Sequence, residues 1–600
     1  DPDNPRYVMG GSYLGTIELL DMESKMSTDV MAAPIQYLGR EARDMEYLFN
    51  WNAPIIWSQH EPGTFYHGAQ LVLRTRDNGL TWEEISPDLT RDQDDKQGNG
   101  GGPYTNEAVG AENYGTLAYI IESPHEKGVL YTGSDDGLVY ITKNGGETWE
   151  NITPKGLKEC LVNAIEVSPH DPATVYIATT RYKFNDYTPA LYKSSDYGKT
   201  WTNISSGIPY GAFTRVVRED QEQKGLLYAG TEKGLYVSWN DGKSWEPLQL
   251  NLPKTPITDL KVHQGDLIVA TSGRSFWILD NITTLSQYKG DSTSLKLFKP
   301  EETIHGFWGS PLNSSSKKVE GTNPYEGVNP ANGMVIYYNL PKAMDSTEIT
   351  MEIKNSQGKV VRSFSSKKDE SYVPHHGGGA PPAPVLGTDK GLNRFVWDLK
   401  TPILPGIPGV YIEANFTGHK VPPGNYTINL KADGQTVSAQ GVIVPTPNTG
   451  MTQERFEEQD RFMNELEANL TDMHNKLNAL FKVQGQLKGL LKDLDNEDLK
   501  KEGQSLLDKL KAWDEDMVQR KSQAYDDVEN FPNKFTAEYL FLMNQSNSSL
   551  PRVNQSSKDR KKELDAQWVG LKQRAETLMK TDIPNFNKKL WENGVGAIRM

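Results

Sequence analysis

The chain has 600 residues, of which 24% are charged and 36% hydrophobic, so it is long enough for several folded domains. Its 79 acidic and 64 basic residues give a net charge of −15, which excludes nucleic acid as a partner because phosphate binding needs a basic surface. No stretch approaches the roughly 20 apolar residues of a membrane span. The single cysteine, Cys160, excludes an intrachain disulfide and a cysteine-based metal cluster, so packing must stabilise the fold.

One eight-residue pattern, S/T-x-D/N-x-G-x-T/S-W, occurs four times in the first half of the chain. The copies start at residues 75, 142, 194 and 238 and read TRDNGLTW, TKNGGETW, SSDYGKTW and SWNDGKSW. The third residue can accept hydrogen bonds from backbone N–H groups of its own turn, and the glycine can adopt the positive φ of a tight turn. We therefore expect hairpin turns in which a structural role falls to Asp77, Asn144, Asp196 and Asn240. The tryptophan that follows is expected to pack on the neighbouring unit.

A short apolar strand that ends in a small residue recurs at residues 123–133, 168–178, 225–230 and 266–270, and degenerate copies at residues 1–10 and 60–68 bring the number of repeats to six. The motif starts are separated by 67, 52 and 44 residues. Several strands in a period of this size are typical of propeller blades, whose core forms only when neighbouring blades stack. Residues 1–288 are therefore predicted to form a β-propeller.

The turns resemble the Asp-boxes of the BNR-repeat families, which include sialidases, two-propeller xyloglucanases and sortilin-type receptors. A longer likeness, over residues 71–90, 133–137, 214–219, 273–280, 391–398 and 421–427, is to bacterial proteins labelled sortilin-like, Vps10-like or BNR-repeat glycosyl hydrolases. The resemblance implies the propeller fold and leaves the reaction open. It also implies a longer N-terminal region with a second propeller, so we expect an upstream segment of the same protein or a partner chain to cover residues 1–20.

Three further regions follow the repeats. The Ser-, Lys- and Asn-rich stretch 289–324 is predicted to be a linker. Six short β runs between residues 334 and 444 predict an antiparallel, immunoglobulin- or fibronectin-like β-sandwich over 325–447. Apolar residues then step by three and four, which predicts a helical bundle over 452–600 whose long first helix packs on the other helices and on the β domains. The fold class is thus mainly β with an α tail.

Residue patterns of known enzymes are scarce. The arginine-bearing motif of sialidases is absent, as are the G-x-S-x-G, H-E-x-x-H and P-loop motifs. Asp135 and Asp136 are neighbours in one loop, so this pair cannot flank a sugar from two sides, and a role in the turn is the simpler interpretation. We find no catalytic pair in the sequence.

Histidines do not predict a metal site. His60, His67, His125 and His170 fall in different repeats, and three of them occupy the same repeat position, which indicates a repeated structural role. The adjacent pair at 375 and 376 is by itself a poor ligand set. No metal and no cofactor is expected.

Arginine and aromatic residues outside the repeat consensus are the binding candidates, because binding hot spots use these types. One acidic residue, Glu112 of the Gly-rich insertion 98–112, is added to this set. The candidates are Tyr104, Glu112, Arg181, Tyr182, Arg215, Arg218, Arg274 and Trp277. The structural alternative is that arginines link blades and that Trp277 belongs to a strand.

We expect an extracytoplasmic bacterial protein, part of a cell-surface assembly, that binds a protein, peptide or glycan without cleaving it. The alternative is a glycoside hydrolase that acts on a polysaccharide or sialoside through the propeller cleft.

Overall fold

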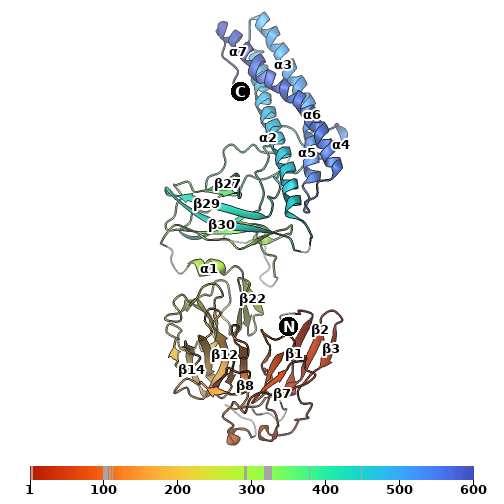
Figure 1. Ribbon diagram of the computed structural model, residues 1–600. Coiled ribbons are helices and arrows are strands. Elements are labelled where there is room, and N and C mark those ends of the chain that lie inside the picture. Colours follow the sequence, from red (N-terminus) through yellow and green to blue (C-terminus); the bar gives the residue numbers. More distant parts are fainter. Residues whose placement is uncertain are drawn as a thin grey trace. The chain divides into compact units, whose positions relative to one another are not determined.

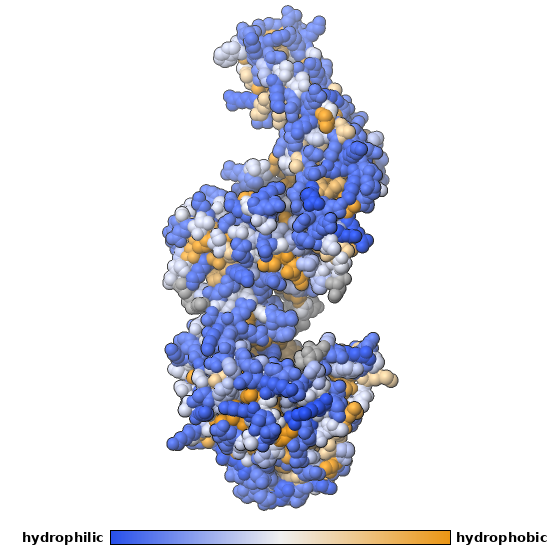
Figure 2. All heavy atoms as spheres, viewed as in Figure 1, coloured by the Kyte–Doolittle hydropathy of each residue, from blue (hydrophilic) through white to orange (hydrophobic). Residues whose placement is uncertain are grey.

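The computed structural model describes residues 1, 4–98, 104, 106, 110, 112–288, 293–315, 327–376, 379–447 and 449–600. Two compact units make up the chain, Asp1–Gly290 and Asp291–Met600. The first consists mainly of β-sheets, followed by the short helix α1 (Thr283–Tyr288), and the second joins β-sheets to a C-terminal helical region (Figure 1). The prediction of a mainly β chain with an α tail is thereby confirmed. The face seen in Figure 2 is largely hydrophilic, with apolar side chains in small groups.

Within its described residues the first unit contains six sheets, in each of which successive strands pair antiparallel in chain order. The strands are β1 (Tyr7–Gly11), β2 (Ile17–Asp21) and β3 (Met26–Asp29); β4 (Ile55–Trp57), β5 (Phe65–Gly68), β6 (Val72–Thr75) and β7 (Glu83–Glu84); β8 (Leu117–Glu122), β9 (Leu130–Ser134), β10 (Val139–Thr142) and β11 (Glu150–Asn151); β12 (Leu161–Val167), β13 (Val175–Arg181), β14 (Asp186–Ser194) and β15 (Thr202–Asn203); β16 (Thr214–Glu219), β17 (Leu227–Thr231), β18 (Gly234–Ser238) and β19 (Glu246–Pro247); and β20 (Ile257–His263), β21 (Asp266–Thr271) and β22 (Phe276–Leu279). Each sheet corresponds to one of the six predicted repeats.

Neighbouring sheets pack on one another through their first strands. β4 contacts β8, β8 contacts β12, β12 contacts β16, and β16 contacts β20. Apolar side chains fill the space between sheets, as where Val162 and Ile165 of β12 share a cluster with Tyr131 and Val139 of the preceding sheet. Burying a large aliphatic side chain contributes about 1.5–3 kcal/mol, so this packing stabilises the order of the sheets.

The four repeated turns connect the third and fourth strands of their sheets. Asp196, between β14 and β15, accepts hydrogen bonds from the backbone N–H of Thr200 (2.9 Å) and from the hydroxyl of the same residue (2.7 Å). These hydrogen bonds lower the pKa of Asp196 to about 2. Asp77, Asn144 and Asn240 each accept the backbone N–H four residues later in the same way. All four side chains thus bond to their own turn.

The tryptophan after each turn links its sheet to the preceding one. Trp245 is 6% exposed, and its indole N–H donates to the carbonyl oxygen of Ile204, just after β15 (2.6 Å). The other three donate in the same manner, Trp82 to Val30, Trp149 to Ile85 and Trp201 to Ile152. Gly242 of the turn has φ +79°, and a Cβ there would lie 2.7 Å from the Ile204 side chain. Glycine is therefore needed both for the turn and for this close contact.

Histidines at one repeated position form a second link between sheets. The imidazole Nε2 lies 2.8 Å from a backbone carbonyl oxygen of the next sheet in three pairs: His60 with Ser123, His125 with Ser168, and His170 with Asp220. The repeated position therefore has a repeated structural contact. Among the described residues, no group of three or more His, Cys, Asp or Glu is placed to hold a metal ion.

The first and last sheets of this unit carry exposed apolar side chains. Phe276 of β22 is 77% exposed, and Ile278 of the same strand and Val8 of β1 are also exposed. Exposed apolar strands at a sheet edge favour association. A segment or partner that covers residues 1–20 stays a prediction.

In the described residues of the second unit, the β part consists of two sheets around one core, with strand orders β23-β25-β28 and β24-β30-β29-β26-β27. Their strands are β23 (Lys296–Leu297), β24 (Thr303–His305), β25 (Met334–Leu340), β26 (Thr350–Lys354), β27 (Val360–Ser365), β28 (Gly391–Trp397), β29 (Gly424–Ala432) and β30 (Gln435–Pro445). Tyr338, Phe395 and Trp397 lie fully buried in this core. The six strands predicted from the sequence correspond to β25 to β30.

The segment 289–324 is not a strand-free linker, so that prediction is wrong in part. Lys296 and Leu297 of β23 pair antiparallel with β25, and β24 pairs parallel with β30. The parallel pair also corrects the expectation of a purely antiparallel sandwich. A strand of two or three residues is too short to show an alternation of apolar and polar residues. Its conformation depends on pairing with the partner strand, which the local sequence does not reveal. Residues 289–292 and 316–326 lie outside the described part of the chain.

The helical region begins with α2 (Gln453–Leu490), the long helix that the apolar spacing predicts. It continues with α3 (Glu497–Met517), α4 (Asp527–Asn530), α5 (Phe535–Ser546), α6 (Gln555–Thr577), a π-helical turn (Leu578–Asp582) and α7 (Ile583–Glu592). The stripe of α2 shares one core cluster with α3, α5 and α6 and with Leu404, Ile407 and Phe416 from the connection between β28 and β29. The helix thus packs on the other tail helices and on the β part of its own unit, as predicted. In the described residues, no helix is long and apolar enough to cross a membrane.

His419 forms a buried junction between this connection and α2. Its Nδ1 lies 2.8 Å from Glu467 Oε1 and its Nε2 lies 2.9 Å from Asp460 Oδ1, and its side chain is 3% exposed. Burial by itself would lower the pKa of His419, but the hydrogen bonds to Asp460 and Glu467 outweigh it and raise the pKa to about 9. The imidazolium is therefore the form that the folded unit favours.

This raised pKa predicts that the second unit is less stable at alkaline pH. The unfolded value is about 6.5, so the stabilising contribution is complete below that pH and is lost as the pH rises through about 9. We expect the Tm of the wild type to fall over this range, and His419→Gln to lack this fall. The Tm is measured by thermal unfolding at a series of pH values. His376→Gln, a change at an exposed histidine, is the control and should keep the wild-type dependence of Tm on pH. A wild-type pH profile in His419→Gln would contradict the prediction.

Candidate functional site

A pocket of about 530 Å³ lies in the first unit, at the starts of the first strands of four sheets. β8, β12, β16 and β20 each have a register shift there that leaves one residue unpaired. These residues are Ala118, Asn163, Arg215 and Thr258, and all four line the pocket. Because a β-bulge redirects its extra residue, one irregularity repeated in four sheets turns four residues toward the same space.

Aromatic side chains from two other segments complete the wall. Trp51 precedes β4 and is largely exposed, while Tyr182 and Phe184 belong to a 3₁₀ turn that directly follows β13. The amides of Asn50 and Asn163 lie in the same wall. Ring faces combined with a few polar groups are typical of a site for a small ligand or a short stretch of a polymer.

Two carboxyl groups line the pocket from separate parts of the chain. Glu112 precedes β8 and forms an isolated β-bridge with Asn50, and Asp135 lies in the turn between β9 and β10. The sequence placed Asp135 beside Asp136 and offered no second acid across a cleft. The fold brings Glu112 to the same pocket, and acid–base cleavage of a glycosidic bond needs two such carboxyl groups.

The surroundings of Asp135 favour its protonated form. Its Oδ1 accepts hydrogen bonds from the backbone N–H groups of Gly115 (3.0 Å) and Thr116 (2.8 Å). Burial, together with the nearby charge of Asp136, nevertheless raises the pKa of Asp135 to about 8. Asp136 is buried and accepts the backbone N–H of Arg91 (2.7 Å), a bond that ties it to the connection between β7 and β8. Asp135 is thus the carboxyl group suited to donate a proton at neutral pH.

Arg215 is the basic member of the bulge set, and its charge is already compensated. Its guanidinium pairs with Glu232 at 2.7 Å and lies 5.9 Å and 5.3 Å from the ring centroids of Tyr182 and Phe213. The two rings stack on each other with centroids 5.4 Å apart. An arginine held in this way is less available to an anionic ligand than a free one.

Three of the eight binding candidates from the sequence, Glu112, Tyr182 and Arg215, line the pocket. Two more lie beside it. Tyr104 packs on the pocket residue Tyr114, with ring centroids 4.6 Å apart, and Arg181 adjoins Tyr182 and pairs with Asp186 at 3.1 Å. Most of the insertion 98–112 lies outside the described residues.

The remaining candidates, Arg218, Arg274 and Trp277, are not among the residues of the pocket wall. Arg218 is buried, pairs with Asp259 at 2.9 Å and donates to the carbonyl oxygen of Leu260 at 2.7 Å. These bonds join β16 to β20, which fits the structural alternative that arginines link neighbouring sheets. The side chains of Arg274 and Trp277 donate to nearby backbone carbonyl oxygens of their own hairpin.

Sequence reasoning missed Trp51, Asn163 and Thr258. Residues 118, 163, 215 and 258 occupy one position of the repeat, near the start of each first strand. Aligning the repeats at this position could have identified Asn163 and Thr258 as candidates. The four residues are of different types, so a search for a consensus residue does not detect the position.

No model of a known protein family matches the chain. Part of it is similar to curated glycoside hydrolases. It is 22% identical over 308 residues to an oligoxyloglucan-reducing end-specific xyloglucanase of Emericella nidulans. The matched stretch covers 46% of this chain and 37% of that protein. It is 29% identical over 314 residues to a probable oligoxyloglucan-reducing end-specific xyloglucanase of Neosartorya fischeri. This match covers 46% of the present chain and 36% of the relative. The chain thus spans little more than a third of the length of these relatives.

Among solved structures, the chain is similar to the GH74 xyloglucanase from Xanthomonas campestris, with a TM-score of 0.34 and 18% identity over 47% of this chain and 44% of that one. It is also similar to the GH74 enzyme of Niastella koreensis, with a TM-score of 0.33 and 12% identity over 73% and 64%. Because both TM-scores are below 0.5, neither likeness bears on the fold or the function.

The curated relatives correct the function expected from the sequence. Both are named xyloglucanases, which are glycoside hydrolases, so the preference for a binding protein without catalytic activity is wrong. The alternative, a glycoside hydrolase, is the interpretation that they favour. The sortilin-like and BNR-repeat names find no support in these comparisons.

Proposed function

We propose that this chain is a glycoside hydrolase that cleaves a neutral, β-linked polysaccharide of the xyloglucan class. We further propose that its six sheets are the blades of a propeller, with the pocket near the axis where the first strands meet. The observation that carries the proposal is that Glu112 and Asp135 line one pocket. The similarity to proteins named xyloglucanases supports it.

Asp135 is the proposed general acid and Glu112 the proposed general base. With a pKa of about 8, Asp135 holds its proton at neutral pH and can deliver it to the glycosidic oxygen as the C–O bond breaks. Glu112 accepts a proton from the water that attacks the anomeric carbon. The bonding electrons of the broken C–O bond remain on the oxygen that Asp135 protonates.

The pocket chemistry favours an uncharged sugar chain. Trp51 and Tyr182 offer ring faces, and Asn163 offers an amide that can both donate and accept a hydrogen bond. A sialoside would need several free arginines to hold its carboxylate. Among the described residues of the wall, the cations are Arg215, which is paired with Glu232, and Lys183, so the wall lacks such an arginine cluster.

A polymeric substrate also bears on where the protein acts. Polysaccharide chains do not cross a membrane unaided, so we propose that the protein works outside the cytoplasm.

Hydrolysis by the full chain tests the proposal. Reducing-sugar release is measured on xyloglucan, other β-glucans and a sialoside, and we expect turnover of the xyloglucan class. Asp135→Asn and Glu112→Gln should each lower kcat by about 100-fold or more, because general acid–base catalysis contributes about 10²–10⁴-fold. The rate should also fall as the pH rises through about 8, because Asp135 then loses its proton.

Asp196→Asn is the matched control. It makes the same change at a carboxylate of a repeated turn outside the pocket, where the sister turns already carry Asn144 and Asn240. This variant should keep full activity. The absence of turnover on every polysaccharide, or full activity in Asp135→Asn, would overturn the proposal.

A further inference from the structure

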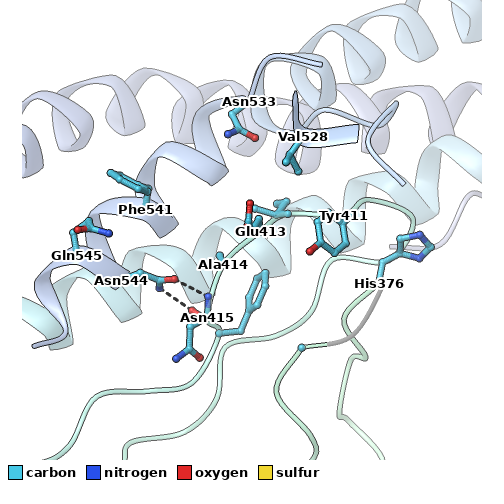
Figure 3. Close-up of a pocket in the computed structure, with 13 residues that line it drawn as sticks. His376, Tyr411, Glu413, Ala414, Asn415, Val528, Asn533, Phe541, Asn544 and Gln545 are labelled. Carbon is cyan, nitrogen blue, oxygen red and sulfur yellow. Dashed lines mark hydrogen bonds between the residues drawn. The ribbon is translucent and has the colours of Figure 1, made fainter. Parts of the chain in front are cut away.

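A second pocket, of about 650 Å³, lies in the second unit between the extended segment 411–416 and the helices α4 and α5 (Figure 3). The segment is tied down at both ends. The Tyr411 N–H donates to the carbonyl oxygen of Ser522 (2.9 Å), and the Asn415 N–H donates to the amide oxygen of Asn544 (2.6 Å). The Asn544 amide donates back to the Asn415 carbonyl oxygen (2.8 Å). These bonds fix both walls, so the hollow is part of the folded structure.

Four polar side chains on this wall make no hydrogen bond or ion pair with the described residues. They are the hydroxyl of Tyr411, the carboxylate of Glu413 and the amides of Asn533 and Gln545. Figure 3 shows Tyr411 and Glu413 on the extended segment and Asn533 and Gln545 on the helical side. Free donors and acceptors gathered around one hollow are available to a ligand.

Phe541 provides an apolar surface beside these polar groups. It lines the pocket on α5 and is 63% exposed, whereas its neighbours Leu540 and Leu542 are buried. A single exposed ring is ordinary on a protein surface. Phe541 differs from an ordinary exposed ring in two respects. It lies beside polar groups that have no partner among the described residues, and the buried side chains next to it hold its helix in place.

We infer that this pocket binds a neutral glycan chain. A pyranose ring has an apolar face of C–H groups and a rim of hydroxyls that both donate and accept hydrogen bonds. Phe541 matches the apolar face, whose C–H groups are attracted to the negative face of an aromatic ring. The amides of Asn533 and Gln545 match the hydroxyls.

The charge of the wall narrows the ligand class. Among its described residues there is no lysine or arginine, and Glu413 is acidic. Phosphate, carboxylate and sulfate groups would meet no lysine or arginine to bind them, and the Nε2 of the lining residue His376 lies 3.1 Å from the carbonyl oxygen of Gln523. An uncharged, hydroxyl-rich ligand fits, and the polysaccharide proposed as substrate of the first unit belongs to this class. The choice of that glycan rests on the proposed function, whereas binding here requires no catalysis.

Affinity electrophoresis of the full chain in gels that contain xyloglucan or another neutral β-glucan tests the inference. Asp135→Asn combined with Trp51→Ala is the background, so that the polymer stays intact and the pocket of the first unit, to which the proposed function assigns the same glycan, binds it more weakly. We expect retardation by the polymer, with Phe541→Ala weakening the apparent affinity by about tenfold or more and Gln545→Ala weakening it less. Trp591→Ala is the matched control, because it removes a ring that is 78% exposed on α7, outside the pocket, and should change nothing.

Circular dichroism is used to check that the variants are folded, which we expect because Phe541 and Gln545 are both exposed. Hydrolysis by the wild type, together with undiminished binding in Phe541→Ala, would overturn the inference and leave the proposed function intact. Binding that depends on Phe541, without hydrolysis by the wild type, would support the inference and overturn the proposed function. A background chain that binds no neutral glycan, or that binds an anionic polymer in preference, would also overturn the inference.

Discussion

Leu470→Asp is expected to unfold the helical region of the second unit. Leu470 is fully buried in the middle of the α2 stripe, in the cluster that joins the tail helices. A carboxylate there must either stay charged without solvent or take up a proton, and both outcomes cost several kcal/mol. That cost is comparable with the total stability of a typical domain, about 5–15 kcal/mol. We expect loss of helical circular dichroism and aggregation on size-exclusion chromatography.

Asn475→Asp is the control for this change. It places the same carboxylate on the exposed side of α2, so it should melt as the wild type does. If Leu470→Asp instead melted like the wild type, the stripe would have to be solvent-exposed and would more reasonably serve a partner.

Trp245→Ala is expected to lower the free energy of unfolding of the first unit by about 3–5 kcal/mol, as other buried Trp-to-Ala changes do. The indole is buried in the largest core cluster of this unit, and it also donates to the carbonyl oxygen of Ile204 after the preceding sheet. The change removes packing and a link between sheets together. Urea unfolding followed by tryptophan fluorescence measures the loss.

Trp245→Phe separates the two contributions. It keeps much of the buried ring and removes the hydrogen bond to Ile204, so it should cost about 1 kcal/mol from that bond, in addition to a smaller packing loss. The expected order of stability is wild type, then Trp245→Phe, then Trp245→Ala. Equal stability of all three proteins would show that the tryptophan does not join the sheets.

Local signals in the sequence determined the elements themselves. Asp196 bonds to Thr200 four residues away, so the turn pattern contains both partners and can be recognised without knowledge of the fold. The spacing of the apolar residues between Met463 and Leu487 determined α2 in the same way, because a period of 3.6 puts them on one face. The number of sheets in the first unit followed from counting such repeats.

Pairings between distant segments were not readable in this way. β24 is three residues long and pairs with β30, which lies far along the chain. Nothing in residues 303–305 marks a strand until its partner is placed beside it. The polar composition of 289–324 therefore predicted a linker where the described residues of the segment include the strands β23 and β24.

The candidate site was decided almost wholly by the tertiary structure. Residue type selected Tyr182 and Arg215, which line the pocket, but it selected Arg218 equally, and that side chain is bound in an ion pair between sheets. Glu112 and Asp135 could not be paired in advance, because they belong to different loops. A turn depends on hydrogen bonds within a few residues, so its sequence determines it. A pocket depends on which residue each bulge leaves unpaired and on how several sheets pack, and only long-range contacts decide that.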